Sequence, residues 1–392
     1  MKPNKRLLLL LLTMIMSVAM LVPAMAAAPS VNTHAEAAAL IDVTSGRILY
    51  SKNGDKKLRI ASLTKIMTAI VAIEYGTLSD KVKTSINAYG VEGSSIYLKL
   101  GEEMSLHHLL YGLMLRSGND AATAIAEHVG GSVDGFVRLM NEKAEQIGMT
   151  SSSFKNPHGL DADGHLSSAN DMARLTAYAL QNPVFRDIVK TPSIKVPNPY
   201  EKWDHLWRNK NKMLHLYDGA DGVKTGYTKT AKRCLVSSAT RDGQQLAAVT
   251  LNDGDDWADH ARMLDYGFAN FQLHPFYHTG EKFPGTELYS PYDFTYPLAT
   301  DEVSQVTYSL KNEPPTTLSG KLGIRAVAEY RLQGEVIGRL PLYEHDHPAL
   351  KSNDNSRHRG QSASSEPEIR IRDHPIVMMR RLLTALFQVS GD

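Results

Sequence analysis

The chain has 392 residues, a formal net charge of +1 and a single cysteine. This length is enough for two domains with a sizeable core. The near-zero charge gives no global field that would favour nucleic acid as a partner. One cysteine excludes any intrachain disulfide, and its place in the apolar run 234–239 favours a buried thiol over a nucleophile.

The N-terminus carries an export signal. Three basic residues among the first six precede an apolar run over 7–22, and small residues follow at 24–26. This pattern is typical of a secretory signal peptide, here residues 1–26. An uncleaved membrane anchor is the alternative, although the run is short for a bilayer span. With either reading we expect the rest of the chain to be exported and extracytoplasmic.

The next 250 residues alternate between strand and helix patterns. Residues 150–168 and 191–222 are expected to be loop-like or irregular. We expect a hairpin over 37–43 and 47–52, helices over 62–76, 105–113, 120–129, 134–147 and 170–180, strands over 223–227, 233–240 and 244–251, and a helix capped by Asp255 or Asp256 that runs to Phe271. This order predicts an α+β domain over 34–275, with helices packed on an antiparallel sheet.

The sequence changes character after this domain. Short β-like runs over 303–310, 323–332 and 335–342 are separated by proline and glycine turns. They predict a small all-β domain over 276–344. The polar residues 345–374 then predict a flexible linker.

The last residues, 375–392, have the pattern of an amphipathic helix. Apolar residues such as Leu382 and Leu386 fall on one side at helical spacing, and Arg380 and Arg381 fall on the other. The segment is too short to cross a bilayer but is suited to lie in its interface. We therefore expect peripheral attachment to the outer face of the cytoplasmic membrane; docking on the protein itself is the alternative.

One pair of residues suggests nucleophilic catalysis. Ser62 and Lys65 begin the first long helix, and their i, i+3 spacing places hydroxyl and amine on one face. The lysine can accept the serine proton only when it is neutral, and lowering its pKa from about 10.4 to near 7 costs roughly 4.6 kcal/mol. Burial and a second cation would supply this. Lys224 is the available second cation.

Two further motifs accompany this pair. Ser117-Gly-Asn119 lies at a break between helices, and Lys224-Thr225-Gly226 opens a strand. A lysine, a hydroxyl and a glycine on a strand edge suit an extended, anionic ligand. Each motif has an ordinary alternative, since Ser62 could be a helix cap, Ser117 and Asn119 a turn, and Lys224 a surface charge. Ser-x-x-Lys also recurs at 152–155, so the ordered set carries the argument.

With their wider contexts at 61–68, 115–121 and 156–160, these motifs resemble those of low-molecular-mass penicillin-binding proteins, the serine-type D-alanyl-D-alanine carboxypeptidases. The resemblance covers roughly residues 35–275. It implies a β-lactamase/transpeptidase-like fold, an antiparallel sheet flanked by helices, followed by a small all-β domain. It implies an enzyme without metal or cofactor that acts on peptidoglycan stem peptides ending in D-Ala-D-Ala and binds β-lactam antibiotics covalently.

The resemblance also implies a role for each site residue. Ser62 would be the acylated nucleophile and Lys65 its base, while Ser117 and Asn119 would shuttle a proton and hold the substrate amide. The substrate would bind residues 224–227 by strand addition. There Lys224 and Thr225 would bind its carboxylate beside Gly226, and the backbone N–H groups of Ser62 and Tyr227 would form an oxyanion hole.

The sequence departs from the family pattern at two places. Lys232 stands where members commonly have a glycine shortly after Lys-Thr-Gly. Some members also use an arginine upstream of the last helix to bind the carboxylate, whereas this chain has only His260 and Arg262 nearby. Which cation assists Lys224 is therefore left open by the sequence.

Other activities are weighed against this one. A class A β-lactamase would need a Glu-x-x-Leu-Asn stretch, which the chain lacks. A metallopeptidase is disfavoured because His107-His108 and the other histidines lack zinc-ligand spacing; these two are expected on a helix surface. A DD-endopeptidase would use the same residues and stays open. A non-catalytic cell-wall binding protein is disfavoured by the intact set of catalytic residues.

Overall fold

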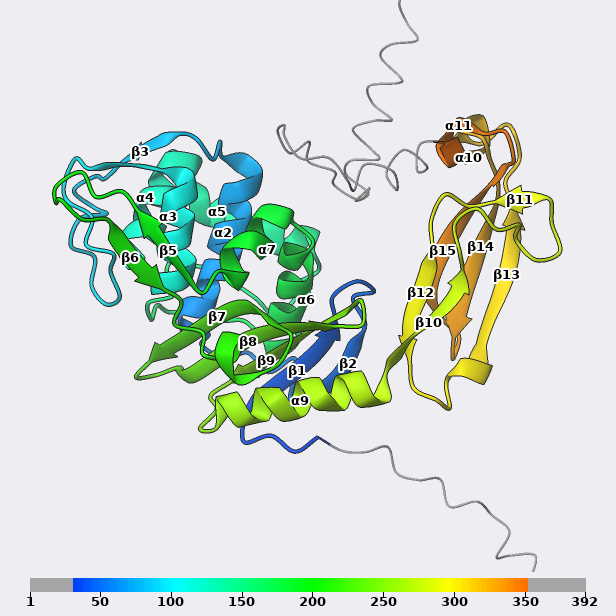
Figure 1. Ribbon diagram of the computed structural model, residues 1–392, viewed down its shortest axis with the longest axis horizontal. Coiled ribbons are helices and arrows are strands. Elements are labelled where there is room, and N and C mark those ends of the chain that lie inside the picture. The colour runs from blue at the N-terminus through cyan, green and yellow to red at the C-terminus, as the bar shows by residue number, and fades with distance from the viewer. Residues whose placement is uncertain (1–30, 352–392) are drawn as a thin grey trace, which may run out of the picture. The chain divides into compact units, whose positions relative to one another are not determined.

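The computed structural model describes residues 31–351 (Figure 1). Its helical segments are η1 (Ala61–Leu63), α2 (Thr64–Tyr75), α3 (Leu106–Tyr111), η2 (Gly112–Arg116), α4 (Asn119–Gly130), α5 (Val133–Gln146), α6 (Ala169–Leu180), α7 (Pro183–Lys190), α8 (Met213–Leu216), α9 (Asp256–Asn270), η3 (Val303–Gln305), α10 (Leu318–Lys321) and α11 (Pro348–Lys351). Its strands are β1 (Ala37–Asp42), β2 (Ile48–Lys52), β3 (Lys81–Lys83), β4 (Glu103–Ser105), β5 (Ser193–Val196), β6 (His205–Arg208), β7 (Ala220–Thr228), β8 (Lys232–Arg241), β9 (Gln244–Leu251), β10 (Gln272–Tyr277), β11 (Leu288–Tyr289), β12 (Phe294–Leu298), β13 (Val306–Asn312), β14 (Ile324–Leu332) and β15 (Glu335–Glu344).

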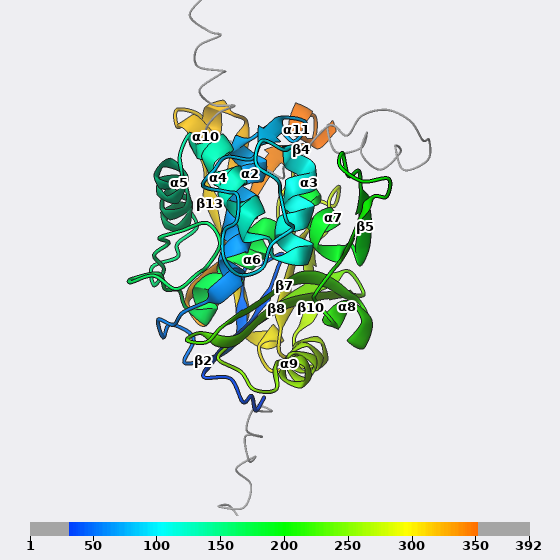
Figure 2. The same cartoon turned by 90° about the vertical axis from the view of Figure 1, so that its left-hand side faces the viewer.

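A five-stranded antiparallel sheet organises the larger, N-terminal part. Its strand order is β2-β1-β9-β8-β7, so β7 forms one edge. Helix α9 packs on one face, and α6 and α7 pack on the other, as Figures 1 and 2 show. Because both faces are covered, every residue of β1 is buried, and so are most residues of β8 and β9. The predicted α+β class is confirmed.

Helix α2 runs through the middle of the helical layer. Nine of its twelve residues are buried, because it contacts α4, α5, α6 and α7. Helices α3, α5 and α6 begin at side-chain caps: Ser105, Ser132 and Ser168 each accept a backbone N–H from the first turn. Helix α5 begins at Val133, one residue before the predicted start at 134, with Ser132 as its cap. Asp255 stands at the start of α9, as predicted, but makes no side-chain cap hydrogen bond.

One stretch of the sequence was read wrongly. Residues 191–222 are not irregular, because they contain the β5–β6 hairpin, α8 and the start of β7. Helix α7 follows α6 closely: the Asn182 side chain accepts two backbone N–H groups and Pro183 occupies the first turn. His107 and His108 are half-buried, and burial lowers the pKa of each.

The C-terminal part of the described chain is all β, as predicted. It contains a four-stranded antiparallel sheet of order β11-β15-β14-β13 and a separate pair, β10-β12. Aromatic side chains fill its core, where Phe294 and Tyr330 lie 4.6 Å apart between ring centres. The predicted domain boundary at residue 275 falls inside β10.

Several predictions concern residues outside the described range. The signal peptide over 1–26, most of the linker over 345–374 and the amphipathic helix over 375–392 stay predictions. Within residues 31–351, no helix combines the length and apolar character needed to cross a bilayer.

Candidate active site

Ser62 lies in η1, at the point where the chain enters α2. The preceding residue, Ala61, has a φ of 46°, in the left-handed region that non-glycine residues rarely adopt. Its carbonyl accepts the Thr64 hydroxyl at 2.8 Å. A Cβ atom at Gly159 would lie only 1.9 Å from the oxygen of that carbonyl. The turn before Ser62 therefore packs closely against residue 159, which has room only for a glycine. The nucleophile candidate thus sits on a strained and tightly packed turn.

Lys65 reaches Ser62 from the next turn, as the i, i+3 spacing predicts. Its side chain is fully buried, and its Nζ lies 3.1 Å from Ser62 Oγ, 2.7 Å from Asn119 Oδ1 and 2.6 Å from the His158 carbonyl. A neutral amine has two N–H donors and one lone pair. It can therefore donate to Asn119 and His158 while accepting the Ser62 hydroxyl.

The electrostatic setting favours this neutral form. Burial holds the pKa of Lys65 well below its ordinary value, and the positive charges of Lys224 and Lys210 lower it further, while Asp120 opposes them. Burial and Lys210 also lower the pKa of Lys224, to about 7. The two lysines therefore stand in different settings, because the charges of two other lysines act on the Lys65 amine in addition to its burial.

Ser117 and Asn119 lie at the break between η2 and α4. Ser117 is buried and has a left-handed φ of 63°, which turns the chain into α4. Asn119 is buried too, and its amide bridges two groups: Oδ1 accepts from Lys65, and Nδ2 donates to the Glu92 carbonyl at 2.6 Å. The predicted break thus places Asn119 in direct contact with Lys65.

Lys224, Thr225, Gly226 and Tyr227 lie in the edge strand β7. Lys224 is 1% exposed, and its Nζ donates to the Thr225 carbonyl at 2.9 Å, whereas Tyr227 is 64% exposed. A side chain at Gly226 would lie 3.2 Å from the Ser62 backbone nitrogen. This close approach brings the strand beside the turn that carries Ser62.

Two contributors were not predicted from the sequence. Lys210 is exposed, donates to Ser94 Oγ at 3.2 Å and acts electrostatically on both Lys65 and Lys224. The His158 carbonyl accepts from Lys65. Lys210 lies among polar residues in a stretch that was expected to be irregular, so no local pattern distinguished it. Residues 156–160 contributed to the family resemblance, but the sequence did not indicate that a carbonyl of this segment contacts Lys65.

The second Ser-x-x-Lys motif has a structural role. Ser152 Oγ lies 2.7 Å from Ser167 Oγ and donates to Asp171 Oδ2 at 2.8 Å. The same Asp171 oxygen accepts the Ser151 backbone N–H. Ser152 therefore helps anchor a loop to α6.

The structure also shows Lys232, His260 and Arg262, the residues discussed above where the sequence departs from the family pattern. Lys232 has a φ of 59°, which explains why a glycine suits this position. His260 is fully buried between the Ser237 and Thr250 hydroxyls, and burial lowers its pKa to about 3, so it is neutral. Arg262 pairs with Asp259. Neither His260 nor Arg262 is an available carboxylate-binding cation.

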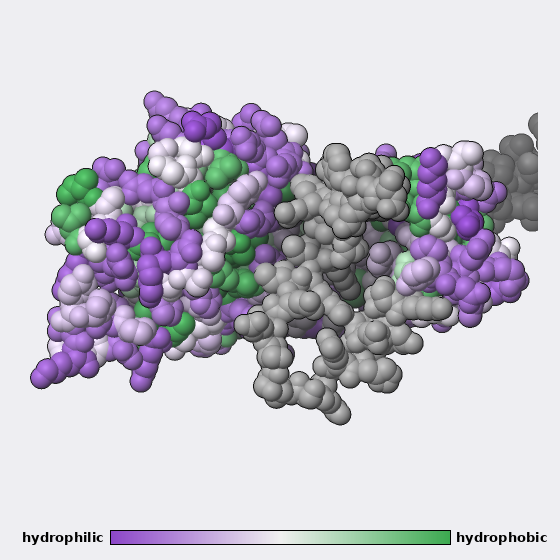
Figure 3. All heavy atoms as spheres, turned by 90° about the horizontal axis from the view of Figure 1, so that it is seen from above, coloured by the Kyte–Doolittle hydropathy of each residue, from purple (hydrophilic) through white to green (hydrophobic). Residues whose placement is uncertain are grey.

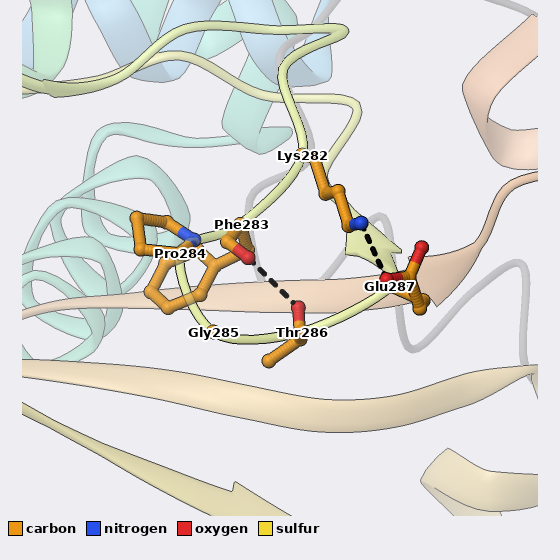
Figure 4. A pocket seen from close by; sticks show the side chains of 6 residues that line it. All are labelled: Lys282, Phe283, Pro284, Gly285, Thr286 and Glu287. Carbon is orange, nitrogen blue, oxygen red and sulfur yellow. Dashed lines mark hydrogen bonds and ion pairs between the residues drawn. The ribbon is translucent and has the colours of Figure 1, made fainter.

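A hollow in the C-terminal part is unrelated to these residues. Figure 4 shows that six consecutive residues, 282–287, line it. The Lys282–Glu287 ion pair and a hydrogen bond from the Thr286 hydroxyl to the Phe283 carbonyl hold the loop. Because a single loop supplies the whole lining, we assign the hollow to the shape of that loop.

Sequence comparisons place the chain among peptidases. A family model described as D-alanyl-D-alanine carboxypeptidase, Peptidase S11, matches residues 23–255. The D-alanyl-D-alanine carboxypeptidase DacF of Bacillus subtilis is 40% identical over 260 residues, covering 62% of this chain and 64% of that protein. DacC of Escherichia coli, which has the same description, is 32% identical over 343 residues, covering 80% and 84%.

Solved structures have the same fold. Penicillin binding protein 5 from Haemophilus influenzae matches with a TM-score of 0.66 at 27% identity, covering 81% of this chain and 98% of that one. A D-alanyl-D-alanine carboxypeptidase from Mycobacterium tuberculosis matches with a TM-score of 0.59 at 32% identity, covering 62% and 95%. The former match extends beyond the five-stranded sheet region into the C-terminal part.

Proposed function

Because the chain belongs to the D-alanyl-D-alanine carboxypeptidase family, we propose that it is a serine-type enzyme that removes the terminal D-alanine from peptidoglycan pentapeptide stems. The observation that carries this proposal is the buried Lys65 amine, 3.1 Å from Ser62 Oγ and with a lowered pKa. A neutral amine at this distance is what a serine needs to become a nucleophile.

Acylation begins with proton transfer from Ser62 Oγ to Lys65 Nζ. The oxygen attacks the carbonyl carbon between the two D-alanines, and the new C–O bond gives a tetrahedral intermediate. The C–N bond then breaks, and the proton passes from Lys65, with Ser117 as shuttle, to the departing amine of D-alanine. Water hydrolyses the resulting ester on Ser62 by the reverse proton route.

The remaining residues bind and orient the substrate. Asn119 holds the substrate amide, and the stem lies along residues 224–227 as an added strand. The backbone N–H groups of Ser62 and Tyr227 stabilise the oxyanion; the close approach of Gly226 to Ser62 supports this role. Lys224 and Thr225 bind the terminal carboxylate, and Lys210 is the assisting cation, since it already acts on Lys224.

The same acyl transfer accounts for β-lactam binding. The antibiotic's ring carbonyl takes the place of the scissile peptide, and its opened ring stays attached to Ser62. We propose an extracytoplasmic site of action, because peptidoglycan lies outside the membrane; the N-terminal signal pattern and the C-terminal amphipathic pattern agree with this location.

The direct test compares wild type with Ser62→Ala. Wild type should release D-alanine from a pentapeptide stem and label with a fluorescent penicillin; Ser62→Ala should lose both, by about 1,000-fold or more in turnover. Circular dichroism checks that the variant is folded. Labelling of Ser62→Ala at the wild-type level would falsify the nucleophile assignment. Cleavage of cross-linked dimers without pentapeptide cleavage would assign the site to an endopeptidase.

A further inference from the structure

Two loops near Asn119 carry large aromatic side chains that project into solvent. Tyr97, in the β3–β4 connection, is 85% exposed; Tyr200 and Trp203, in the β5–β6 hairpin, are 46% and 68% exposed. We call these three residues the aromatic rim. Scattered exposed apolar groups need no explanation, whereas a group of large rings beside a site does.

Tyr97 is held in its exposed position by a strained backbone. Its φ is 64°, a conformation that is a true outlier for a bulky residue. Its neighbours Ile96 and Leu98 are buried, and their N–H groups donate to the buried carboxylate of Asp120. Ser95 Oγ donates to the same carboxylate at 2.6 Å. A strained backbone conformation that several hydrogen bonds hold in place is typical of functional positions.

The rim is continuous with the proposed site. The Ser94 carbonyl accepts the Asn119 backbone N–H at 2.7 Å, and Ser94 Oγ accepts from Lys210. Lys99 Nζ lies 3.9 Å from the centre of the Tyr200 ring, which joins the two loops. The segment that presents Tyr97 is therefore also the segment that packs against the amide-binding Asn119.

The chemistry around the rim suits a neutral, polar ligand. Lys99 and Lys202 are balanced by Glu201 and Asp204, all exposed. Figure 3 shows hydrophilic and hydrophobic residues interspersed on the face of the molecule that it draws. A polyanion or an anionic membrane would call for excess positive charge. Aminosugar rings have apolar C–H faces and hydrogen-bonding edges, which match flat aromatic rings set among polar side chains.

We propose that the aromatic rim stacks on the sugar rings of the glycan to which the stem peptide is attached. This inference rests on the proposed function and adds a specificity for glycan-linked stems over free peptides. An extended pentapeptide spans at most about 17 Å. The sugars of a bound stem therefore lie beyond the residues that touch the scissile bond, where loops bordering the site can contact them.

The test compares two substrates, a free pentapeptide and the same pentapeptide attached to its disaccharide. Wild type should have the higher kcat/KM on the disaccharide-linked substrate. The double variant Tyr97→Ala/Trp203→Ala should lose about tenfold in kcat/KM on that substrate, mainly through KM, and change less than twofold on the free pentapeptide. Tyr97→Phe, which keeps the ring, should retain the wild-type preference.

Tyr75→Ala is the matched control, because Tyr75 is also half-exposed but lies at the end of α2. It should leave both values unchanged. Equal kcat/KM on the two substrates in wild type, or equal losses on both in the double variant, would overturn the proposal. Loss of binding to phosphatidylglycerol vesicles in the double variant, with an unchanged substrate preference, would assign the rim to a membrane. No cleavage of either substrate by wild type would instead reject the proposed function.

Discussion

At the scale of single residues, the site is built on two buried lysines in different states. Lys65 has a pKa well below its ordinary value, so it is suited to accept a proton; Lys224 has a pKa of about 7, so it is charged below neutrality. Burial, together with the charges on Lys224 and Lys210, favours the neutral form of Lys65, and a bound carboxylate would in turn favour the charged form of Lys224. In the proposed mechanism, Lys224 would therefore link substrate binding to the state of the base.

This linkage predicts the pH dependence of turnover. Because kcat/KM reports the free enzyme, it should fall as the pH rises above about 7, where Lys224 loses its proton. The fall in kcat should occur at higher pH, because bound carboxylate raises the pKa of Lys224. A substrate ending in D-alaninamide has no carboxylate and should lack this alkaline decline. The same decline with both substrates would show that Lys224 does not bind the carboxylate.

The backbone conformation of Lys232 leads us to expect that glycine at this position would stabilise the protein. Its φ of 59° costs about 1–2 kcal/mol for a residue with a Cβ, and glycine removes this cost while losing about 0.5–1 kcal/mol to chain entropy. Lys232→Gly should therefore raise the free energy of unfolding by about 0.5–1 kcal/mol in urea denaturation. Lys229→Gly, at a neighbouring position without a positive φ, serves as control and should not stabilise. Equal effects of the two changes would contradict this reading.

At the scale of elements, the site depends on how closely β7 approaches η1. A methyl group at Gly226 would meet the Ile60 carbonyl and the Ser62 nitrogen, both at 3.2 Å. Because both of these atoms belong to the backbone, they cannot rotate away as a flexible side chain could. Strand β7 must therefore move away from the turn by a few tenths of an ångström. The oxyanion donors proposed on Ser62 and Tyr227 would then separate.

Gly226→Ala should accordingly slow acylation by penicillin about 10- to 100-fold, because small displacements of catalytic groups have effects of this size. Stopped-flow measurement of the acylation rate tests this. Gly254→Ala is the control, since a Cβ there meets nothing within 4 Å. A wild-type acylation rate in Gly226→Ala would mean that the strand's distance from Ser62 is not critical.

At the scale of the whole molecule, the sequence predicted the elements that have local signals. The hairpin β1–β2, helix α2 and strands β7 to β9 follow alternation and helical spacing, and the family resemblance read from three motifs is confirmed. The β5–β6 hairpin was missed because its strands are four residues each, too short for a period to be recognised.

The contacts that complete the site were beyond the sequence. Lys65 meets Asn119 across 54 residues and the His158 carbonyl across 93. A backbone carbonyl has no sequence signature, so only the fold reveals that acceptor. The effect of Lys210 on the pKa of Lys224 likewise depends on the burial of Lys224. The residues next to Lys224 in the sequence did not indicate that burial.

The central claim is that Ser62, activated by Lys65, is the acylated residue. Mass spectrometry of a tryptic digest after penicillin treatment tests it most directly, because the chain contains a second Ser-x-x-Lys motif at Ser152 as an internal comparison. The account predicts a penicilloyl adduct on the peptide that contains Ser62, absent from Lys65→Ala under the same conditions. An adduct on the peptide that contains Ser152, or undiminished labelling in Lys65→Ala, would contradict it.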